Sequence, residues 1–327
     1  MNHSEQVKAV LGIDIAKATF KVALLRESKF KHKTFPNHQE GFKALTLWLT
    51  QHRAQQVHAC LEATSHYSEP LAEYLFDQGM HVSVVNPARI KGYAQSELVR
   101  TKTDKTDAAL IARFCAVMQP ALWQPEPQEI RVLRAYVRRL DALIDMRQQE
   151  RNRLEATDAV LADAIQSHIV YLEQDIQQTQ QKINDHIDNH PHLKDKKQLL
   201  ESIPGIGPAT INVILSEFAQ VQRFKNAKHL AAFIGVAPRL FESGTSVRGR
   251  SRMSKIGRSQ LRKAFFMPAM VALRYNPIIK SFGERLRASG NTKMQVIGAA
   301  MWKLIHIVYG VLKNEMPFDE KFFVKIA

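Results

Sequence analysis

The sequence predicts an α/β domain followed by a mainly helical region, and three observations support this fold class. Between residues 8 and 118, short apolar runs typical of strands alternate with segments of helical periodicity. From residue 128 onward, apolar residues recur mostly every three or four positions, which is the spacing of helices. Prolines at 120, 125 and 127 separate the two patterns. We therefore expect domains at 1–120, 121–195 and 196–327.

Strands and helices follow a definite order through the first domain. Three strand-like runs come first: "VLGIDI", "KVALL" and "FKHKTF". The helical segment "QEGFKALTLWLTQH" separates them from two tighter strand and helix units, "VHACLEA" with "SEPLAEYLFDQGM" and "HVSVVNP" with "DKTDAALIARFCAVM". A three-strand meander feeding βαβα predicts a mixed sheet covered by helices, an order that suggests the ribonuclease-H fold.

A long polar helical region forms the second predicted domain. Its apolar positions keep near-heptad spacing, which is typical of a helical hairpin or a coiled coil. The pattern suits an internal helix pair and an arm for dimerisation equally well. These apolar positions are Ile130, Leu133, Val137, Leu140, Ile144, Ile165, Ile169, Leu172, Ile176, Ile183 and Ile187.

Charge and cysteine content limit the class of protein. The chain carries 46 Lys and Arg against 31 Asp and Glu, a formal charge of +15, which implies a polyanionic partner, most simply nucleic acid. Cys60 and Cys115 lack CxxC spacing, so we expect free thiols in a reducing cytoplasm. We expect no membrane partner, because the most apolar stretch, residues 297–312, is interrupted by Lys303 and His306 and predicts a core helix.

Four acidic residues form a coherent set in the first domain. Asp14 ends the first strand pattern, Glu62 ends the fourth, and Asp104 and Asp107 lie three apart at a helix start and therefore face one side. In a ribonuclease-H fold the first and fourth strands are neighbours and the last helix crosses their ends, so the four carboxylates would converge. Hard oxygen ligands suit Mg²⁺, and a carboxylate cluster holding such ions is a common device for phosphodiester chemistry.

Each of these acids also has a structural explanation when it is taken alone. A single acid at a strand end is usually a turn former, and Asp104 and Asp107 suit an N-cap and the helix dipole. The set of four within this fold pattern favours the metal site. We therefore predict that Asp14, Glu62, Asp104 and Asp107 bind Mg²⁺.

Two segments of the last domain indicate contacts with phosphate. "IPGIG" has the form of a hairpin whose following helix offers free N–H groups to a DNA backbone, although a tight interhelical turn has the same pattern. The loop predicted at 239–263 is rich in Arg and in glycines that let backbone approach a ligand, although a solvated charged loop would share this composition. The predicted phosphate-binding residues are Gly205, Gly207, Arg239, Arg248, Arg250, Arg252, Lys255, Arg258, Arg262 and Lys263.

Several hydroxyl groups lie in the same basic stretch, and any of them could cap a helix or bind phosphate. A nucleophilic serine needs activation by a base or a metal, and no His or Lys stands beside Ser243 in sequence. Spacing alone therefore does not identify a nucleophile. The candidates are Ser243, Thr245, Ser246, Ser251, Ser254 and Ser259.

Seven segments carry a family resemblance: "GIDIAK", "EATSHY", "VNPARIKGYAQSE", "KTDKTDAALIARF", "LLESIPGIG", "LAAFIGVAPRLFESGTSVRGRSRMSKIGRSQLRKAFFMPAM" and "YGVLKNEMPFD". Together they resemble the DEDD-type insertion-element transposases. That family includes the Piv-type DNA invertases and the bridge-RNA-guided recombinases. The resemblance runs nearly end to end, with the motifs in the right order.

The resemblance implies roles that spacing does not. It implies a RuvC-like first domain whose Asp14, Glu62, Asp104 and Asp107 bind Mg²⁺, a helical arm, and a C-terminal transposase domain in which Ser243 is the nucleophile. In the family, the serine of one protomer is thought to join the acidic site of another and to exchange strands through a phosphoserine link to DNA. A metal site delivered in trans would explain why Ser243 lacks a local base.

The resemblance also implies partners. The family's RNA-guided members select donor and target by pairing a structured non-coding RNA with both DNAs, while the protein grips backbone and shape. This chain shows no obvious base-reading module, which fits. The expected partners are double-stranded donor and target DNA, a bridge RNA, and further copies of the chain in a dimer or a tetramer.

The sequence thus predicts a Mg²⁺-dependent, serine-using DNA recombinase of a prokaryotic mobile element, acting in the cytoplasm on the nucleoid. Three alternatives are a DNA invertase of the same family, a RuvC-like nuclease that resolves branched DNA with metal-activated water, and a non-catalytic architectural binder. A fourth arises because "GIDIAKATFKVALL" is also similar to the first phosphate loop of actin-like kinases and ATPases. That loop favours Gly-Thr or Gly-Ser where this chain has Ala16 and Lys17.

Overall fold

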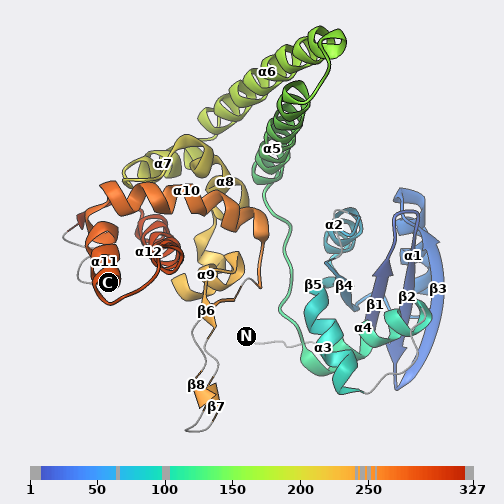
Figure 1. The fold of residues 1–327 in the computed structure, drawn as a ribbon. Helices are drawn as coiled ribbons and strands as arrows, with labels where there is room; N and C mark the ends of the chain where they lie inside the picture. The colour runs from blue at the N-terminus through green and yellow to red at the C-terminus, as the bar shows by residue number, and fades with distance from the viewer. Residues whose placement is uncertain are drawn as a thin grey trace. The chain divides into compact units, whose positions relative to one another are not determined.

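Two compact units, Met1–Glu126 and Pro127–Ala327, make up the chain in the computed structural model (Figure 1). The structure describes residues 9–63, 67–97, 104–239, 242–243, 247–248, 252–254 and 256–320, without the side chains of 104–106, 239, 242–243, 247–248 and 252. The division between the units falls among the prolines that end the first sequence pattern. The expected domain boundaries after residues 120 and 195 stay predictions.

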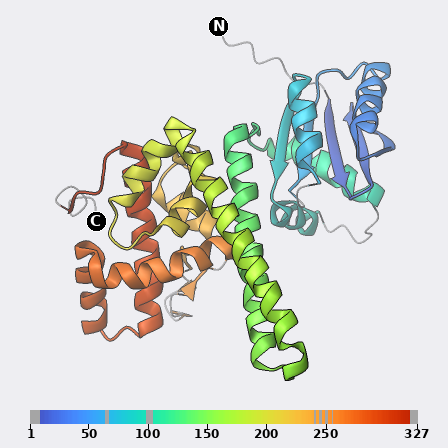
Figure 2. The ribbon, with the colours of Figure 1, turned by 90° about the horizontal axis from the view of Figure 1, so that it is seen from above.

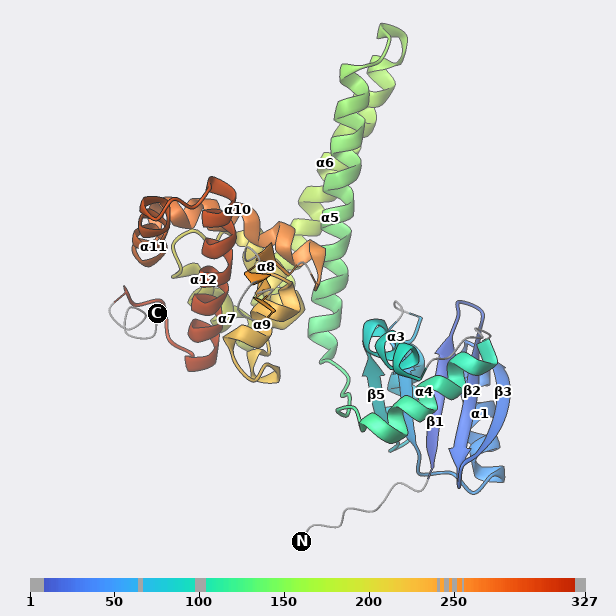
Figure 3. The same cartoon turned by 60° about the horizontal axis from the view of Figure 1, so that its bottom comes forward.

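A five-stranded mixed sheet with the strand order β3-β2-β1-β4-β5 forms the centre of the first unit (Figure 3). The predicted meander is confirmed, because β2 pairs antiparallel with both β1 and β3, and β4 pairs parallel with β1 and with β5. The strands are β1 (Val10–Ile15), β2 (Thr19–Arg26), β3 (Lys29–Pro36), β4 (His58–Glu62) and β5 (His81–Val85).

Helices cover both faces of this sheet. The larger core cluster joins alternate residues of β1 and β2, such as Leu11 and Phe20, to Phe42 of α1 and Leu71 of α2. The opposite face is covered by α4, whose side chain of Cys115 is hydrogen-bonded to that of Cys60 on β4. The helices are α1 (Gln39–Gln51), α2 (Glu69–Asp77), α3 (Pro87–Ser96) and α4 (Asp104–Met118).

The predicted strand "HVSVVNP" is wrong at its end, because helix α3 begins at Pro87. The side chain of Asn86 accepts a hydrogen bond from the Ala88 amide at 2.8 Å and caps the helix. Proline at the first helical position lacks the N–H that would otherwise be unsatisfied there. The pair Asn86 and Pro87 was therefore a helix start signal in the sequence.

Both cysteines are free and buried, as expected from their spacing. The hydrogen bond that the Cys115 thiol makes with Cys60, together with burial, raises the pKa of Cys115 above its usual value. These thiols are packing groups in the layer between α4 and the sheet.

A hairpin of two long helices, α5 (Gln128–Glu155) and α6 (Ala159–Asp188), opens the second unit (Figure 2). Among the predicted apolar positions, Leu133 and Ile183 are fully buried, whereas Ile144 is 38% exposed and Leu143 is buried in its place. The apolar stripe shifts by one residue at this point, because the packing of two helices depends on the shapes of their side chains as well as on the spacing of apolar residues. The two helices are confirmed, and supercoiling of the pair stays a prediction.

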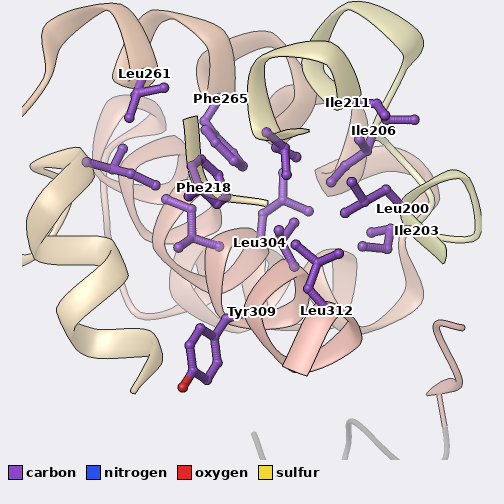
Figure 4. Packing of buried hydrophobic residues seen from close by; sticks show 14 of the residues in the cluster. Leu200, Ile203, Ile206, Ile211, Phe218, Leu261, Phe265, Leu304, Tyr309 and Leu312 are labelled. Atoms are coloured by element: carbon purple, nitrogen blue, oxygen red, sulfur yellow. The ribbon is translucent and has the colours of Figure 1, made fainter. Parts of the chain in front are cut away.

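In the described part of this unit, six further helices form the body, together with a short 3-10 turn at Val221–Arg223. Their core gathers around α12, and Figure 4 shows Phe218, Phe265 and Leu304 meeting inside it. These helices are α7 (Pro191–Glu201), α8 (Pro208–Phe218), α9 (Ala227–Ile234), α10 (Ser259–Tyr275), α11 (Pro277–Ala288) and α12 (Lys293–Asn314).

Among the described residues, α12 is the helix long and apolar enough to span a membrane. Its most apolar window is 67% buried inside the unit. Ala300, Leu304 and Val308 are fully buried against the neighbouring helices. The predicted core helix is therefore confirmed.

A narrow β ribbon occupies the segment that was predicted as a loop at 239–263. At its base β6 (Pro238–Arg239) pairs antiparallel with β9 (Arg252–Met253), and farther out β7 (Glu242–Ser243) pairs with β8 (Val247–Arg248). The loop prediction is wrong for these pairs and for the last five residues, which belong to α10. The two-residue strands are too short for periodicity to reveal them.

Candidate active site and nucleic-acid interface

Asp14 and Glu62 lie side by side at one edge of the sheet. In the parallel pairing of β1 with β4, Ile13 is level with Leu61, so the two acids come next on neighbouring strands. Side chains two residues apart share a face of a sheet, so Asp14 faces the same side as Gly12, and Glu62 the same side as Cys60. That side is covered by α4, and both acids are partly buried beside it.

Helix α4 crosses this face in close contact with the strands. A Cβ atom on Gly12 would lie only 2.1 Å from the Ala108 carbonyl oxygen, so glycine is needed for the helix backbone to approach β1. Ala108 and Ala109 pack with Ala23 of β2. The helix therefore runs from β2 toward β4, and its acidic first turn, which precedes Ala108, begins on the β2 side.

The four predicted metal ligands are only partly brought together among the described side chains. Asp14 and Glu62 are neighbours, and Asp107 is partly buried on the first turn of α4. Asp104 begins α4 as predicted, but its side chain lies outside the description. Within the side chains that the structure describes, no three His, Cys, Asp or Glu are grouped closely enough to hold a metal ion.

Lys21 is a site residue that the motif pattern did not indicate. It lies directly opposite Asp14 in the antiparallel pairing of β1 with β2, so the two side chains share the face covered by α4. Opposite charges at facing positions of a sheet stabilise the pair and reduce the cost of placing Asp14 in a strand. The sequence signal that could have indicated Lys21 is the register of the β1–β2 hairpin, which the tight turn between the two strands determines.

The two glycines of "IPGIG" have different environments. Gly205 has a φ of +104°, and a Cβ there would lie 2.8 Å from the Cβ of Ala272 on α10, so packing explains this glycine. Gly207 is the N-cap of α8 and is open on its Cβ side. Asn276 donates a hydrogen bond to the Pro204 carbonyl at 3.4 Å and fixes the turn. Packing therefore accounts for Gly205, and phosphate contact at Gly207 stays a prediction.

Backbone contacts close the base of the ribbon and join it to α9. The Ser254 amide donates to the Ala237 carbonyl at 2.9 Å, and the Arg258 amide donates to that of Phe233 at 3.3 Å. A Cβ on Gly257 would lie 2.6 Å from the Gly235 nitrogen, so the segments that enter and leave the ribbon are in close contact. Ser243 pairs with Val247 and is therefore remote from this base.

Three of the predicted phosphate-binding residues make contacts within the chain. Arg258 pairs with Glu217 of α8 and lies 4.9 Å from the ring centroid of Phe233. Arg262 donates to the Gly257 carbonyl at 3.3 Å. Lys263 Nζ lies 3.6 Å from the Asp145 carboxylate.

The other basic residues of this segment are placed by backbone alone or not at all. Arg239, Arg248 and Arg252 lie on the paired strands, with side chains outside the description. Arg250 and Lys255 lie outside the described residues. The ribbon thus carries basic positions on both of its strands.

Two family models match the chain, the first over the first unit and part of the helical hairpin, and the second within the second unit. Residues 11–162 match a model described as "Transposase", and residues 197–284 match one described as "Transposase IS116/IS110/IS902 family". The first match includes the sheet edge with Asp14 and Glu62. The second includes the "IPGIG" turn and the ribbon with Ser243.

Relatives with similar sequences come from several bacteria. The chain is 37% identical over 318 residues to the pilin gene-inverting protein of Moraxella bovis, covering 96% of this chain and 98% of that protein. The Moraxella lacunata protein of the same name has the same identity and coverage. An insertion element IS110 protein of 43.6 kDa from Streptomyces coelicolor is 29% identical over 140 residues, covering 43% of this chain and 33% of that protein. This chain therefore belongs to the IS110-type family of insertion-element transposases and Piv-type DNA invertases.

Proposed function

We propose that this protein is a DNA recombinase of a prokaryotic mobile element, which cuts and rejoins DNA strands. The observation that carries the proposal is the 37% identity with the pilin gene-inverting proteins over 96% of the chain. The formal charge of +15 supports a DNA substrate, because Lys and Arg bind phosphates and release counterions. The protein acts in the cytoplasm, where its DNA substrate lies.

In this proposal, the first unit has a RuvC-like fold of the ribonuclease-H type, and this fold contains the acidic site. The sheet order β3-β2-β1-β4-β5 supports it, since it makes β1 and β4 neighbours and aligns Asp14 with Glu62. The partly buried oxygen ligands fit Mg²⁺, and Asp104 and Asp107 would complete the set from α4. Bound there, Mg²⁺ would offset the negative charge that develops on the phosphate during strand cleavage.

Ser243 is the nucleophile in this proposal. Its hydroxyl oxygen forms a bond to phosphorus while the bond from phosphorus to one deoxyribose oxygen breaks. The serine proton is lost, and the released deoxyribose oxygen gains a proton and leaves as a hydroxyl. Attack of another DNA hydroxyl on the phosphoserine reverses these changes and frees Ser243. One phosphodiester bond is exchanged for another, so no external energy source is required.

The complete site combines two protomers in this proposal. Ser243 of one copy joins the acids of another, so the protein acts as a dimer or as a tetramer of paired dimers. A structured bridge RNA selects the DNA sites by base pairing, and the protein holds backbone and shape. These features follow from the family resemblance. Sequencing the RNA that copurifies with the active protein tests whether a guide RNA is bound.

Inversion of a DNA segment is the second candidate function. The relatives that match nearly the whole chain are named for inverting a pilin gene. An invertase and a transposase would share the same cleavage chemistry and differ in the arrangement of their sites. A plasmid carrying two candidate sites in inverted orientation distinguishes them, because an invertase flips the intervening segment and a transposase moves the element.

Trapping the covalent intermediate tests the proposed chemistry. Denaturing gels of wild-type protein with its labelled DNA should show a protein to DNA adduct that is absent in Ser243→Ala. Ser246→Ala, an identical substitution three residues away, should keep the adduct. Recombination that persists in Ser243→Ala would contradict the proposal and favour a nuclease that uses water.

A further inference from the structure

Glu217 of α8 is enclosed by three arginines from two other elements. Arg134 Nε lies 3.4 Å and Arg138 Nη2 lies 3.6 Å from its Oε1 atom, both from α5. Arg258, between the ribbon and α10, donates to the Oε2 atom. One carboxylate therefore ties α5 to the base of the ribbon that carries Ser243.

The side chains of the three arginines differ in how far they are buried. The side chain of Arg134 is 13% exposed and also donates to the Ser216 carbonyl at 3.0 Å. Arg134 is therefore a structural partner of Glu217. Its positive charge offsets the cost of burying the Glu217 carboxylate, which is itself 11% exposed. Arg138 and Arg258 are 54% and 49% exposed, so about half of each side chain faces solvent.

The cluster carries more positive charge than Glu217 neutralises. Three guanidinium groups against one carboxylate leave an excess of two positive charges. Each guanidinium has five N–H donors, and the contact of Arg138 or Arg258 with Glu217 uses one terminal nitrogen. Because the two groups approach the two oxygens of the same carboxylate, their forks are close together and their side chains are ordered before a ligand arrives.

We propose that Arg138 and Arg258, held by the carboxylate of Glu217, bind one backbone phosphate of DNA at the base of the ribbon. The inference rests on the proposed function, since it takes DNA as the substrate of that ribbon. Paired guanidinium forks match the oxygens of a phosphate and bind it more strongly than a single ammonium does. The contact anchors the duplex to α5, whereas Ser243 lies farther along the ribbon.

Arg139 provides a matched control. It is the next residue on α5, and its side chain is 53% exposed, but it pairs with Asp175 of α6 at 3.0 Å. Substituting Arg138 or Arg139 by glutamine removes the same charge from neighbouring positions. Only the direction of the side chain and its partner differ between the two variants.

Binding of a fluorescent duplex of about 30 base pairs, followed by anisotropy from about 50 to 200 mM salt, tests the proposal. We expect Arg138→Gln to weaken binding about three- to tenfold and to reduce the slope of log K against log salt by about 0.9. Arg139→Gln should match the wild type within about twofold. Arg138→Lys should keep the salt slope and lose affinity, because it keeps the charge without the fork.

Each outcome has a defined meaning. Equal weakening by Arg138→Gln and Arg139→Gln would assign the effect to overall charge and overturn the site. An Arg138→Gln variant that binds like the wild type would overturn it as well. Thermal unfolding of each variant checks that folding is intact, and Arg138→Lys provides the test if the glutamine variant unfolds. Wild-type protein that does not bind the duplex would instead contradict the proposed function.

Discussion

The two units balance their partly buried carboxylates in opposite ways. In the first unit, Asp14 and Glu62 lie together at the sheet edge, with Lys21 as the cation in register with Asp14. In the second unit, three arginines enclose the single carboxylate of Glu217. Charge is expensive to bury unless it is paired, so an acidic excess suits a cation and a basic excess suits an anion. The comparison therefore agrees with the two proposals, a cation for the acidic site and a phosphate for the arginine cluster.

The largest effect should come from removing a charge in the acidic excess. Asp14→Asn is expected to lower the rate of strand exchange by about 10²- to 10³-fold, because the proposed site would lose a metal ligand and a preorganised charge. Asp77→Asn, at the exposed end of α2, makes the same change away from the site and should leave the rate unaltered. Strand exchange assayed at fixed Mg²⁺ measures both. Equal rates for wild type and Asp14→Asn would remove the acidic site from the mechanism.

A large loss of stability should follow when the basic cluster loses its carboxylate. Glu217→Ala is expected to cost about 3–5 kcal/mol, because the largely buried guanidinium of Arg134 would lose the carboxylate that offsets its charge. Glu173→Ala is the matched control, since Glu173 is 39% exposed and pairs with Arg147 and Arg151 on the same hairpin. That variant should cost less than about 1 kcal/mol. Denaturant titration measures both, and similar losses would mean that Glu217 is an ordinary surface partner.

A smaller effect tests how the sheet holds the acids in place. Gly12→Ala is expected to cost about 1–3 kcal/mol, because the new methyl group would overlap the backbone of α4 at Ala108. The shift of α4 would also move Asp107 relative to Asp14 and slow strand exchange. In Gly92→Ala, on α3, the methyl group meets nothing within 4 Å, so this control should be neutral or slightly stabilising.

Thermal unfolding and strand exchange are measured on both glycine variants. Together they separate the effect of the packing of α4 on stability from its effect on the position of the acids. Loss of stability with normal exchange in Gly12→Ala would show that α4 does not position the acids. Normal stability would show that the helix backbone accommodates the methyl group. Either result would weaken the link between this close contact and the site.

The smallest expected effect is on the pH dependence of stability and concerns His58. This residue lies at the end of β4 opposite to Glu62. Burial, with a smaller contribution from His81, lowers the pKa of His58 below its usual value of 6.5. The unfolded chain then binds a proton more readily than the folded chain as pH falls below about 6.5, so folding loses stability there. His58→Gln should flatten this loss, which unfolding at about pH 7.5 and pH 5 measures. An unchanged pH dependence would assign the loss to other groups.

Local patterns in the sequence were sufficient for most elements of the fold. Helix α4 has the predicted bounds of Asp104 and Met118, because its apolar residues recur at helical spacing through a single segment. The predicted adjacency of the first and fourth strands is confirmed by the pairing of β1 with β4. The buried register of the hairpin differed from the prediction by one position at Leu143 and Ile144, because two helices pack by shape as well as by period.

The sequence by itself determined the order of elements, the acidic set with Asp14 and Glu62, the basic excess and the family. Periodicity and motifs are properties of neighbouring residues, so one dimension records them. Only the tertiary structure decided that Arg134 and Glu217, 83 positions apart, share one charged cluster with Arg258. Contacts across such distances depend on the packing of whole helices and strands, which no local pattern specifies.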